Sequence, residues 1–336
     1  RLISNISCGL PYEERRPFDP LPGESYETSP GTGSPEQRLR EQDKDGVDAE
    51  VLFPGNVGPG FWRGIRNDNA YKAVVRSYND WLAEEYCAHA PDRLIGVGVI
   101  PITNVDDATD ELQHCADLGL KAIAIDSFPA GNRYPTANDD SFWAAVVDLA
   151  MALTIHVEFG FPRRGRGAAA ATGPSFKYTR QPDPEHHVPD VIERFNKYGF
   201  RGSKQVVQMI WGGVFDRFPK LKVAFLEAGV CFLPYWMERF DEKYLKRKSE
   251  MEPLKLLPSE YIKTNRCYFT CEGEESALPL VIEQFGDECM MYASDYPHWD
   301  TEWPHTVSQV VRRKDISDKT KQKILADNAK SFYRFS

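Results

Sequence analysis

The sequence lacks the features that mark membrane, secreted and nucleic-acid-binding proteins. No apolar run among its 336 residues reaches the roughly 18 that a membrane-spanning helix needs, and no signal peptide opens the chain. The seven cysteines are scattered and none forms a CxxC pair, which predicts reduced thiols in a cytoplasmic protein. A formal net charge of −9 argues against nucleic acid as a partner.

Several common site motifs are also absent. No GxGxxG or GxxxxGK[ST] follows an apolar run, which argues against a dinucleotide-binding or P-loop site. No GxSxG occurs, so a serine nucleophile of the hydrolase type is not indicated. What the chain does have is 41% hydrophobic and 12% aromatic residues, enough for a sizeable folded core.

Short apolar runs alternate with helical patterns along most of the chain. Continuous runs of this length are typical of parallel strands buried on both faces, and they lie at Ala49–Phe53, Leu94–Ile100, Ala122–Phe128, Leu153–Phe159, Val223–Leu226, Cys267–Cys271 and Met290–Ala293. The helical patterns lie at Asp68–His89, Val105–Leu118, Ser141–Met151, Lys204–Phe218, Leu233–Arg247, Ser276–Phe285 and Asp318–Phe332.

This order predicts an α/β fold built on a parallel sheet. A (β/α)8 TIM barrel fits the length, with its first strand expected upstream of Arg1 or missing from the chain. Residues 1–45 are rich in proline, glycine and charge, and we interpret them as an N-terminal arm or loop insertion. Residues 46–336 then form the barrel domain.

Four of the predicted strands end in ionisable side chains. "LTIHVEFG" supplies His156 and Glu158 on the same strand face, "KVAFLEAG" supplies Glu227, "CYFTCEGEE" supplies Glu272, and "MMYASDYPHWD" supplies Asp295 followed by His298. The carboxyl ends of barrel strands meet at one mouth, so these groups predict a metal site there.

Each of these residues has a simpler interpretation when taken alone. A single histidine in an apolar strand is more often a hydrogen-bonded core residue, and Glu227 could pair with a buried arginine. Asp295 could cap the next turn, and Glu272 could open a helix. Carboxylates are rarely buried without a partner, however, and the joint pattern favours metal ligation.

Three of these segments carry a resemblance to a known family. "GVFDRFPKLKVAFLEAG", "YFTCEGEE" and "MMYASDYPHWD" resemble the amidohydrolase-related family of TIM-barrel metal-dependent enzymes, the branch with aminocarboxymuconate-semialdehyde and resorcylate-type decarboxylases. The likeness runs from about residue 36 to residue 335. It implies that His156 and Asp295 bind metal and that Asp295 acts as acid or base. The decarboxylases place a histidine where this chain has Glu227, and the first-strand His-x-His or His-x-Glu motif is expected upstream of Arg1.

The resemblance and the residues together predict a metal-dependent enzyme. The expected ligands are His156, Glu227, Asp295 and Glu272, a carboxylate-rich set for one or two divalent ions of zinc, manganese or iron. Our main hypothesis is a hydrolase or decarboxylase of a small organic acid, amide or ester, with Asp295 and His298 as its catalytic groups. One alternative is a nonheme diiron monooxygenase on the same scaffold, and another is a catalytically inactive barrel with a binding role.

The long segment Gly160–His187 predicts a substrate lid. Its arginines at 163, 164 and 166 suit an anionic group such as an acyl thioester of coenzyme A, although a solvated basic loop is the simpler interpretation. The expected substrate-binding residues are Glu158, Arg163, Arg164, Arg166, His187 and Trp299. The expected partners are a small anionic molecule and further copies of the chain, and neither nucleic acid nor a membrane.

Overall fold

The chain folds around one parallel sheet. The computed structural model describes residues 10–14, 30–31, 33–55, 57–125, 127–132, 134–156, 201–250, 252–298 and 300–335. Seven strands pair in sequence order, each parallel to the next. They are β1 (Glu50–Leu52), β2 (Leu94–Val99), β3 (Ala122–Ile125), β4 (Ala152–His156), β5 (Val223–Leu226), β6 (Cys267–Cys271) and β7 (Met290–Tyr292).

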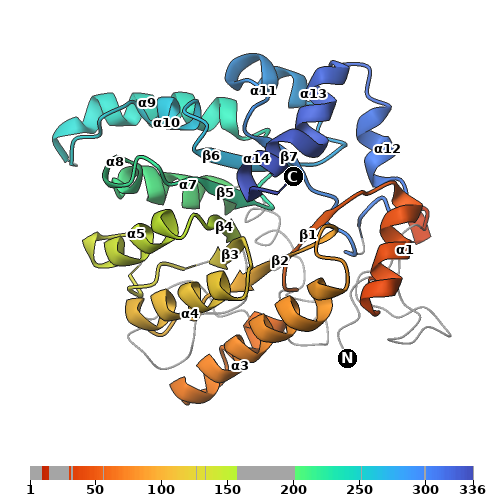
Figure 1. Cartoon of the computed structure of the whole chain (residues 1–336). Helices are drawn as coiled ribbons and strands as arrows, with labels where there is room; N and C mark the ends of the chain where they lie inside the picture. Colours follow the sequence, from red (N-terminus) through yellow and green to blue (C-terminus); the bar gives the residue numbers. More distant parts are fainter. Residues whose placement is uncertain are drawn as a thin grey trace, which may run out of the picture.

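Helices surround the curled sheet and leave its strands at the centre (Figure 1). The α-helices are α1 (Pro35–Asp45), α2 (Val57–Trp62), α3 (Asp68–Trp81), α4 (Val105–Asp117), α5 (Asp140–Asp148), α7 (Arg201–Trp211), α8 (Val214–Arg217), α9 (Leu233–Arg247), α10 (Pro258–Ile262), α11 (Leu278–Phe285), α12 (Thr306–Val311), α13 (Asp318–Gln322) and α14 (Asn328–Tyr333). Short 3-10 or π turns lie at η1 (Tyr12–Glu14), η2 (Leu82–Tyr86), η3 (Cys87–His89), η4 (Ala137–Asp139), η5 (Lys248–Glu250) and η6 (Lys323–Asp327). Among the described residues no helix is both long and apolar enough to cross a bilayer.

This architecture confirms the predicted α/β barrel class, with seven strands in the part of the chain that the structure describes. The predicted bounds of β5, β6 and α9 match those observed. The single helix predicted at Lys204–Phe218 is wrong, because Gly213 takes a left-handed φ of 65° and separates α7 from α8. The proposed domain division at residue 45 stays a prediction, but its last eleven residues form helix α1 rather than a loop.

The strands are buried because helices cover their outer face and side chains fill the interior. All six residues of β2 and all four of β3 and β5 are buried. Phe225 of β5 and Phe269 of β6 stack at 5.5 Å between ring centroids, and Phe269 also packs on Phe232 at the start of α9. A polar contact fixes α3 to β2: the fully buried Asn79 amide donates to the Val99 carbonyl at 3.0 Å and accepts from its N–H at 2.9 Å.

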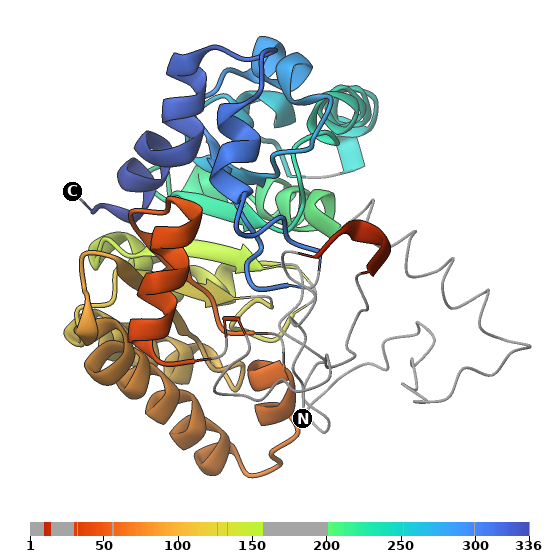
Figure 2. The ribbon, with the colours of Figure 1, turned by 90° about the vertical axis from the view of Figure 1, so that its right-hand side faces the viewer.

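Helix α1 covers the segment that follows β7. It lies beside α12, so a helix from the first part of the chain packs against one from the last part on one side of the barrel (Figure 2). Ser34 caps its first turn and Gly46, with φ of 75°, ends it. The most buried residues of α1 are Arg38, Glu41, Gln42 and Asp45, all polar, so hydrogen bonds hold it in place together with the packing of Leu39 against a small apolar cluster.

Candidate metal centre

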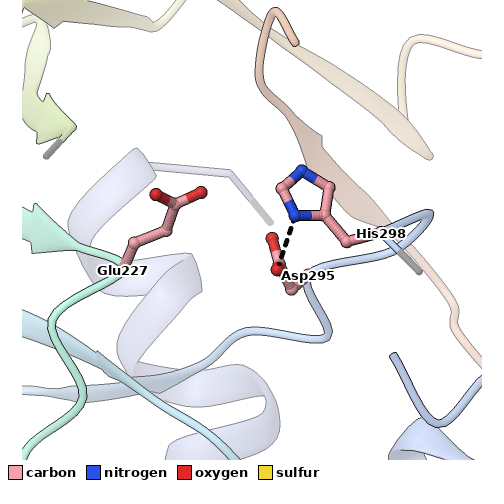
Figure 3. Close-up of side chains that lie close together, drawn as sticks. All are labelled: Glu227, Asp295 and His298. Carbon is pink, nitrogen blue, oxygen red and sulfur yellow. Dashed lines mark ion pairs between the residues drawn. The ribbon is translucent and has the colours of Figure 1, made fainter. Parts of the chain in front are cut away.

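Three acid and base side chains converge where β5 and β7 end. Glu227 follows the last residue of β5, and Asp295 and His298 lie in the turn after β7 (Figure 3). Ligand-type atoms of Glu227, Asp295 and His298 all lie within 4.8 Å of one another. The two strands are parallel, so both deliver their polar ends to the same edge of the sheet.

Two close pairs make up this cluster. Asp295 Oδ2 and His298 Nδ1 lie 2.9 Å apart, a contact marked in Figure 3. His156, the last residue of β4, places Nε2 3.1 Å from Glu227 Oε1. His156 is nearly buried at 8% side-chain exposure, whereas Glu227, Asp295 and His298 expose between 28% and 39%. The nearly buried His156 thus holds Glu227 from the interior of the barrel, while the three-residue cluster itself is open to solvent.

Backbone conformation supports a specialised function for both carboxylates. Glu227 and Asp295 have φ angles of 53° and 52°, in the left-handed region that non-glycine residues avoid at a cost of about 1–2 kcal/mol. The Glu227 N–H is satisfied by Thr270 Oγ1 of β6 at 3.1 Å. Strain at two strand ends, each carrying a carboxylate, is typical of functional sites.

The local electrostatics favour positive charge. The hydrogen bond between His298 and Asp295 raises the pKa of His298 to about 9, although burial of the imidazole opposes this rise. Burial raises the pKa of Asp295 despite the stabilising effect of His298, and the nearby Glu227 and Asp300 add to that rise. Two carboxylates around one imidazole therefore attract either a proton or a metal ion. Mixed oxygen and nitrogen donors of this kind fit manganese, iron or zinc.

Glu272 lies at the rim rather than in the three-residue cluster. It is solvent-exposed, yet desolvation and the neighbouring carboxylates of Glu274, Glu275, Asp295 and Asp300 raise its pKa to about 7. Its predicted function as a ligand stays a prediction, as do those of His156, Glu227 and Asp295. The segment Gly160–His187 and Trp299 lie outside the described residues, as do Glu158, Arg163, Arg164, Arg166 and His187, so the lid stays a prediction too.

Two residues near the site were not found from the sequence. Phe53, just after β1, places the centre of its ring 6.2 Å from that of His156 and so packs beside the imidazole. Glu275 accepts hydrogen bonds from the N–H groups of Val230 at 2.8 Å, Cys231 at 3.1 Å and Glu272 at 2.9 Å. It thereby connects the loop that follows Glu227 to the loop that carries Glu272. Within "EGEE" nothing in the sequence distinguishes Glu275 from its neighbours, because these three hydrogen bonds come from backbone N–H groups.

Comparisons with known proteins agree with this architecture. The chain matches the family model described as Amidohydrolase over residues 20–335. It is 27% identical over 305 residues to the 2-amino-3-carboxymuconate-6-semialdehyde decarboxylase of Dictyostelium discoideum, covering 89% of this chain and 76% of the relative.

Solved structures of two decarboxylases have the same fold. The 5-carboxyvanillate decarboxylase of Sphingomonas paucimobilis has a TM-score of 0.70 at 25% identity, over 95% of this chain and 88% of that one. A variant of the 5-carboxyvanillate decarboxylase of Novosphingobium aromaticivorans, with bound manganese and 3-methoxy-4-hydroxy-5-nitrobenzoic acid, has a TM-score of 0.67 at 25% identity over 89% and 80%. With a family match over nearly all of its length, this chain belongs to the amidohydrolase family.

Proposed function

We propose that this chain is a divalent-metal-dependent decarboxylase of a small aromatic or unsaturated carboxylic acid. The observation that carries the proposal is the convergence of Glu227, Asp295 and His298 at the mouth of an amidohydrolase barrel. The relatives and structural neighbours named above are decarboxylases of small carboxylic acids, and one of them was crystallised with manganese. None of them supports the diiron oxygenase alternative.

The residues at the mouth have the right chemistry to hold the ion. Glu227, Asp295 and His298 would bind it, with His156 holding the Glu227 carboxylate from beneath. A divalent cation, when bound, supplies positive charge that polarises the oxygen atoms of an anionic substrate. We infer manganese as the first ion to test, since carboxylate oxygens suit it.

The protein must also supply a proton. Loss of CO2 from a carboxylate leaves an electron pair on carbon, which a proton takes up, so R–CO2⁻ and H⁺ give R–H and CO2. The pair of Asp295 and His298, 2.9 Å apart, holds a proton between Oδ2 and Nδ1 at the mouth of the barrel. A positioned acid of this kind typically contributes roughly 10²–10⁴-fold to rate.

Hydrolysis of an amide or ester is the second candidate. The observation that favours it is the third acid–base group, Glu227, whose carboxylate faces the Asp295–His298 pair (Figure 3). A water molecule activated between two such groups would attack a carbonyl carbon. Both reactions use the same residues, so the substrate that is consumed decides between them.

The test is CO2 release from a panel of small acids by the purified chain loaded with Mn²⁺. The panel contains 5-carboxyvanillate, 2-amino-3-carboxymuconate-6-semialdehyde and simple hydroxybenzoates, with aryl esters and amides alongside. We expect CO2 from at least one acid, and we expect the Asp295→Asn variant to lose that activity. Ester or amide hydrolysis without CO2 release from any acid would overturn the decarboxylase proposal in favour of hydrolysis.

A further inference from the structure

Helix α1 meets the loop after β7 through buried polar contacts. Arg38, in the first turn of α1, exposes only 8% of its side chain although it is charged. A buried guanidinium is costly unless its charge and its N–H groups find partners. The partners of Arg38 therefore indicate what the burial serves.

Arg38 has partners on both edges of the described sheet. Its Nε donates to Glu50 Oε2 at 2.8 Å, and its Nη2 contacts the other carboxylate oxygen of Glu50, the first residue of β1. Its Nη2 also donates to the backbone carbonyl of Tyr296 at 3.3 Å. The guanidinium carbon lies 4.5 Å from the centre of the Tyr296 ring, so the group stacks on that ring as well.

Tyr296 stands between the two acid–base residues of the site. It follows Asp295 directly and precedes His298 by two positions. Its ring is covered on another side by Trp303 at 5.4 Å, and Trp303 Nε1 donates back to the Glu41 carbonyl of α1 at 3.2 Å. The Asp295–His298 turn is therefore held to α1 at more than one point.

Pro297, the residue after Tyr296, also packs closely against the segment before α1. A Cβ atom built on Gly31 would lie 2.1 Å from Pro297 Cγ, so only glycine fits beside the proline ring. Gly31 also has φ of 75°, and its N–H donates to both carboxylate oxygens of Glu41, at 3.2 and 3.1 Å. The chain before α1 is thus shaped to the turn between Asp295 and His298.

We propose that Arg38 is a positioning residue for the metal centre: through Tyr296 it fixes the turn that presents Asp295 and His298 toward Glu227. The inference rests on the proposed function, since it assigns Arg38 to the same site. Arg38 does not touch the acid–base groups itself. It acts through the Tyr296 carbonyl and ring, and Glu50 on β1 holds its guanidinium in the required plane.

The geometry requires arginine rather than any cation. A planar guanidinium binds a carboxylate with two N–H groups and offers a flat face to an aromatic ring at the same time. Lysine preserves the charge but lacks the fork and the flat face. Arg38→Lys therefore removes the positioning while it leaves a cation opposite Glu50.

The first part of the test needs no enzyme activity. We expect Arg38→Lys to speed amide hydrogen exchange across residues 294–303 and to weaken binding of Mn²⁺ to the full chain, with little change in exchange elsewhere. The matched control is Arg76→Lys, because Arg76 also pairs with a buried carboxylate, Glu111, at 2.9 Å on the outside of the barrel. The inference is overturned if Arg38→Lys and Arg76→Lys give the same exchange and the same Mn²⁺ affinity.

The second part is a double-mutant cycle with Tyr296→Leu, measured as Mn²⁺ affinity and as kcat on whichever acid is decarboxylated. Misplacement of reacting groups by about 1 Å can cost on the order of 100-fold, so we expect each single variant to lower kcat roughly 10–100-fold. The double variant should lose less than the sum of the two single losses, because both changes remove the stacking of Arg38 on the Tyr296 ring, while Tyr296→Leu leaves the hydrogen bond to the backbone carbonyl in place. Additive losses would overturn the inference and assign Arg38 a stabilising function through Glu50.

The two proposals fail differently. If the wild-type chain binds Mn²⁺ but decarboxylates none of the acids, the proposed function is wrong. Amide exchange at residues 294–303 and the Mn²⁺ affinity still test whether Arg38 positions the turn. If Arg38→Lys does not fold, Tyr296→Leu alone removes the stacking contact from the other side, with the bond to the backbone carbonyl kept. Unchanged exchange at residues 294–303 in that variant would overturn the inference.

Discussion

Replacing Glu275 tests how the loops of the site are held. Its carboxylate accepts three backbone N–H groups, from Val230, Cys231 and Glu272, at 2.8–3.1 Å. Two of these groups follow Glu227 in the chain and the third belongs to Glu272, so one side chain fixes two strand-end loops. Gly229, with φ of 61°, allows the close approach, since a Cβ there would lie 3.2 Å from Glu275 Oε2.

The three bonds differ in how much they stabilise the fold. Val230 is fully buried, so Glu275→Ala leaves its N–H without water or a partner, at a cost of about 1–3 kcal/mol. Cys231 and Glu272 are exposed, and water replaces those bonds at a loss of roughly 0.5–1 kcal/mol each. We expect Glu275→Ala to lower the free energy of unfolding by roughly 2–5 kcal/mol in total.

Glu275→Gln should cost less, for a geometric reason. The Gln amide oxygen can take the place of Oε2 and still accept from Val230 and Cys231. Its NH2 group then faces the Glu272 N–H, donor against donor, and only that exposed bond is lost. We expect a loss of about 0.5–1 kcal/mol in the free energy of unfolding. Urea unfolding at pH 7 measures both variants, and Glu283→Gln, exposed on α11, is the matched control within about 0.5 kcal/mol of the parent.

The same variants report on the site. A looser loop after Glu227 should weaken Mn²⁺ binding more in Glu275→Ala than in Glu275→Gln. Equal unfolding free energies for Glu275→Ala and the parent would refute the proposed bonding. A Glu275→Gln variant as unstable as Glu275→Ala would also refute it, because the negative charge of Glu275, rather than the geometry of its hydrogen bonds, would then determine the stability.

Three further predictions follow from the site and from the C-terminal helices. Asp295→Asn should reduce decarboxylation by roughly 10²–10⁴-fold with unchanged unfolding, and activity within about tenfold of the parent would exclude Asp295 as the proton-holding group. Removing metal with a chelator should abolish CO2 release and Mn²⁺ should restore it; restoration by Fe²⁺ alone, with uptake of oxygen, would replace the decarboxylase proposal by an oxygenase. Although burial of its carboxylate opposes the effect, hydrogen bonds from Lys323 and Thr320 lower the pKa of Asp287. The ionised Asp287 therefore stabilises the fold at pH values above its unfolded-state pKa of about 3.9. This contribution is lost as the pH falls through the pKa of Asp287 in the folded state. Urea unfolding should therefore show Asp287→Asn less stable than the parent at pH 7 and the gap narrowing below pH 3.9, whereas a constant gap would contradict the pairing.

Hydrophobic pattern made the strands and the longer helices predictable. β5 and β6 are continuous apolar runs between polar segments, and their bounds follow directly from those runs. Helix α1 has no apolar stripe to reveal it, because the residues that it buries are Arg38, Glu41, Gln42 and Asp45. Asp45 illustrates the difference: it is buried by accepting from Thr306 N at 2.8 Å and Thr306 Oγ1 at 2.6 Å, a partner 261 residues away.

The candidate site was predictable in part for a similar reason. Strand ends with ionisable residues indicated His156, Glu227 and Asp295, because parallel strands bring their carboxyl ends to one edge. The contacts that connect these loops are long-range or involve backbone groups: Glu275 accepts from three backbone N–H groups, and Arg38 reaches Tyr296 across 258 residues. No local pattern carries such information, so these residues required the fold.

The most direct test of the account is where a metal ion binds. Crystals of the full chain with Mn²⁺, measured at the manganese absorption edge, give an anomalous peak that identifies the ion independently of any refinement choice. The account predicts a peak within coordination distance of the side chains of Glu227, Asp295 and His298, lost in the Asp295→Asn variant. A strong peak that none of these three side chains contacts, or no peak at the mouth of the barrel at saturating Mn²⁺, would contradict it.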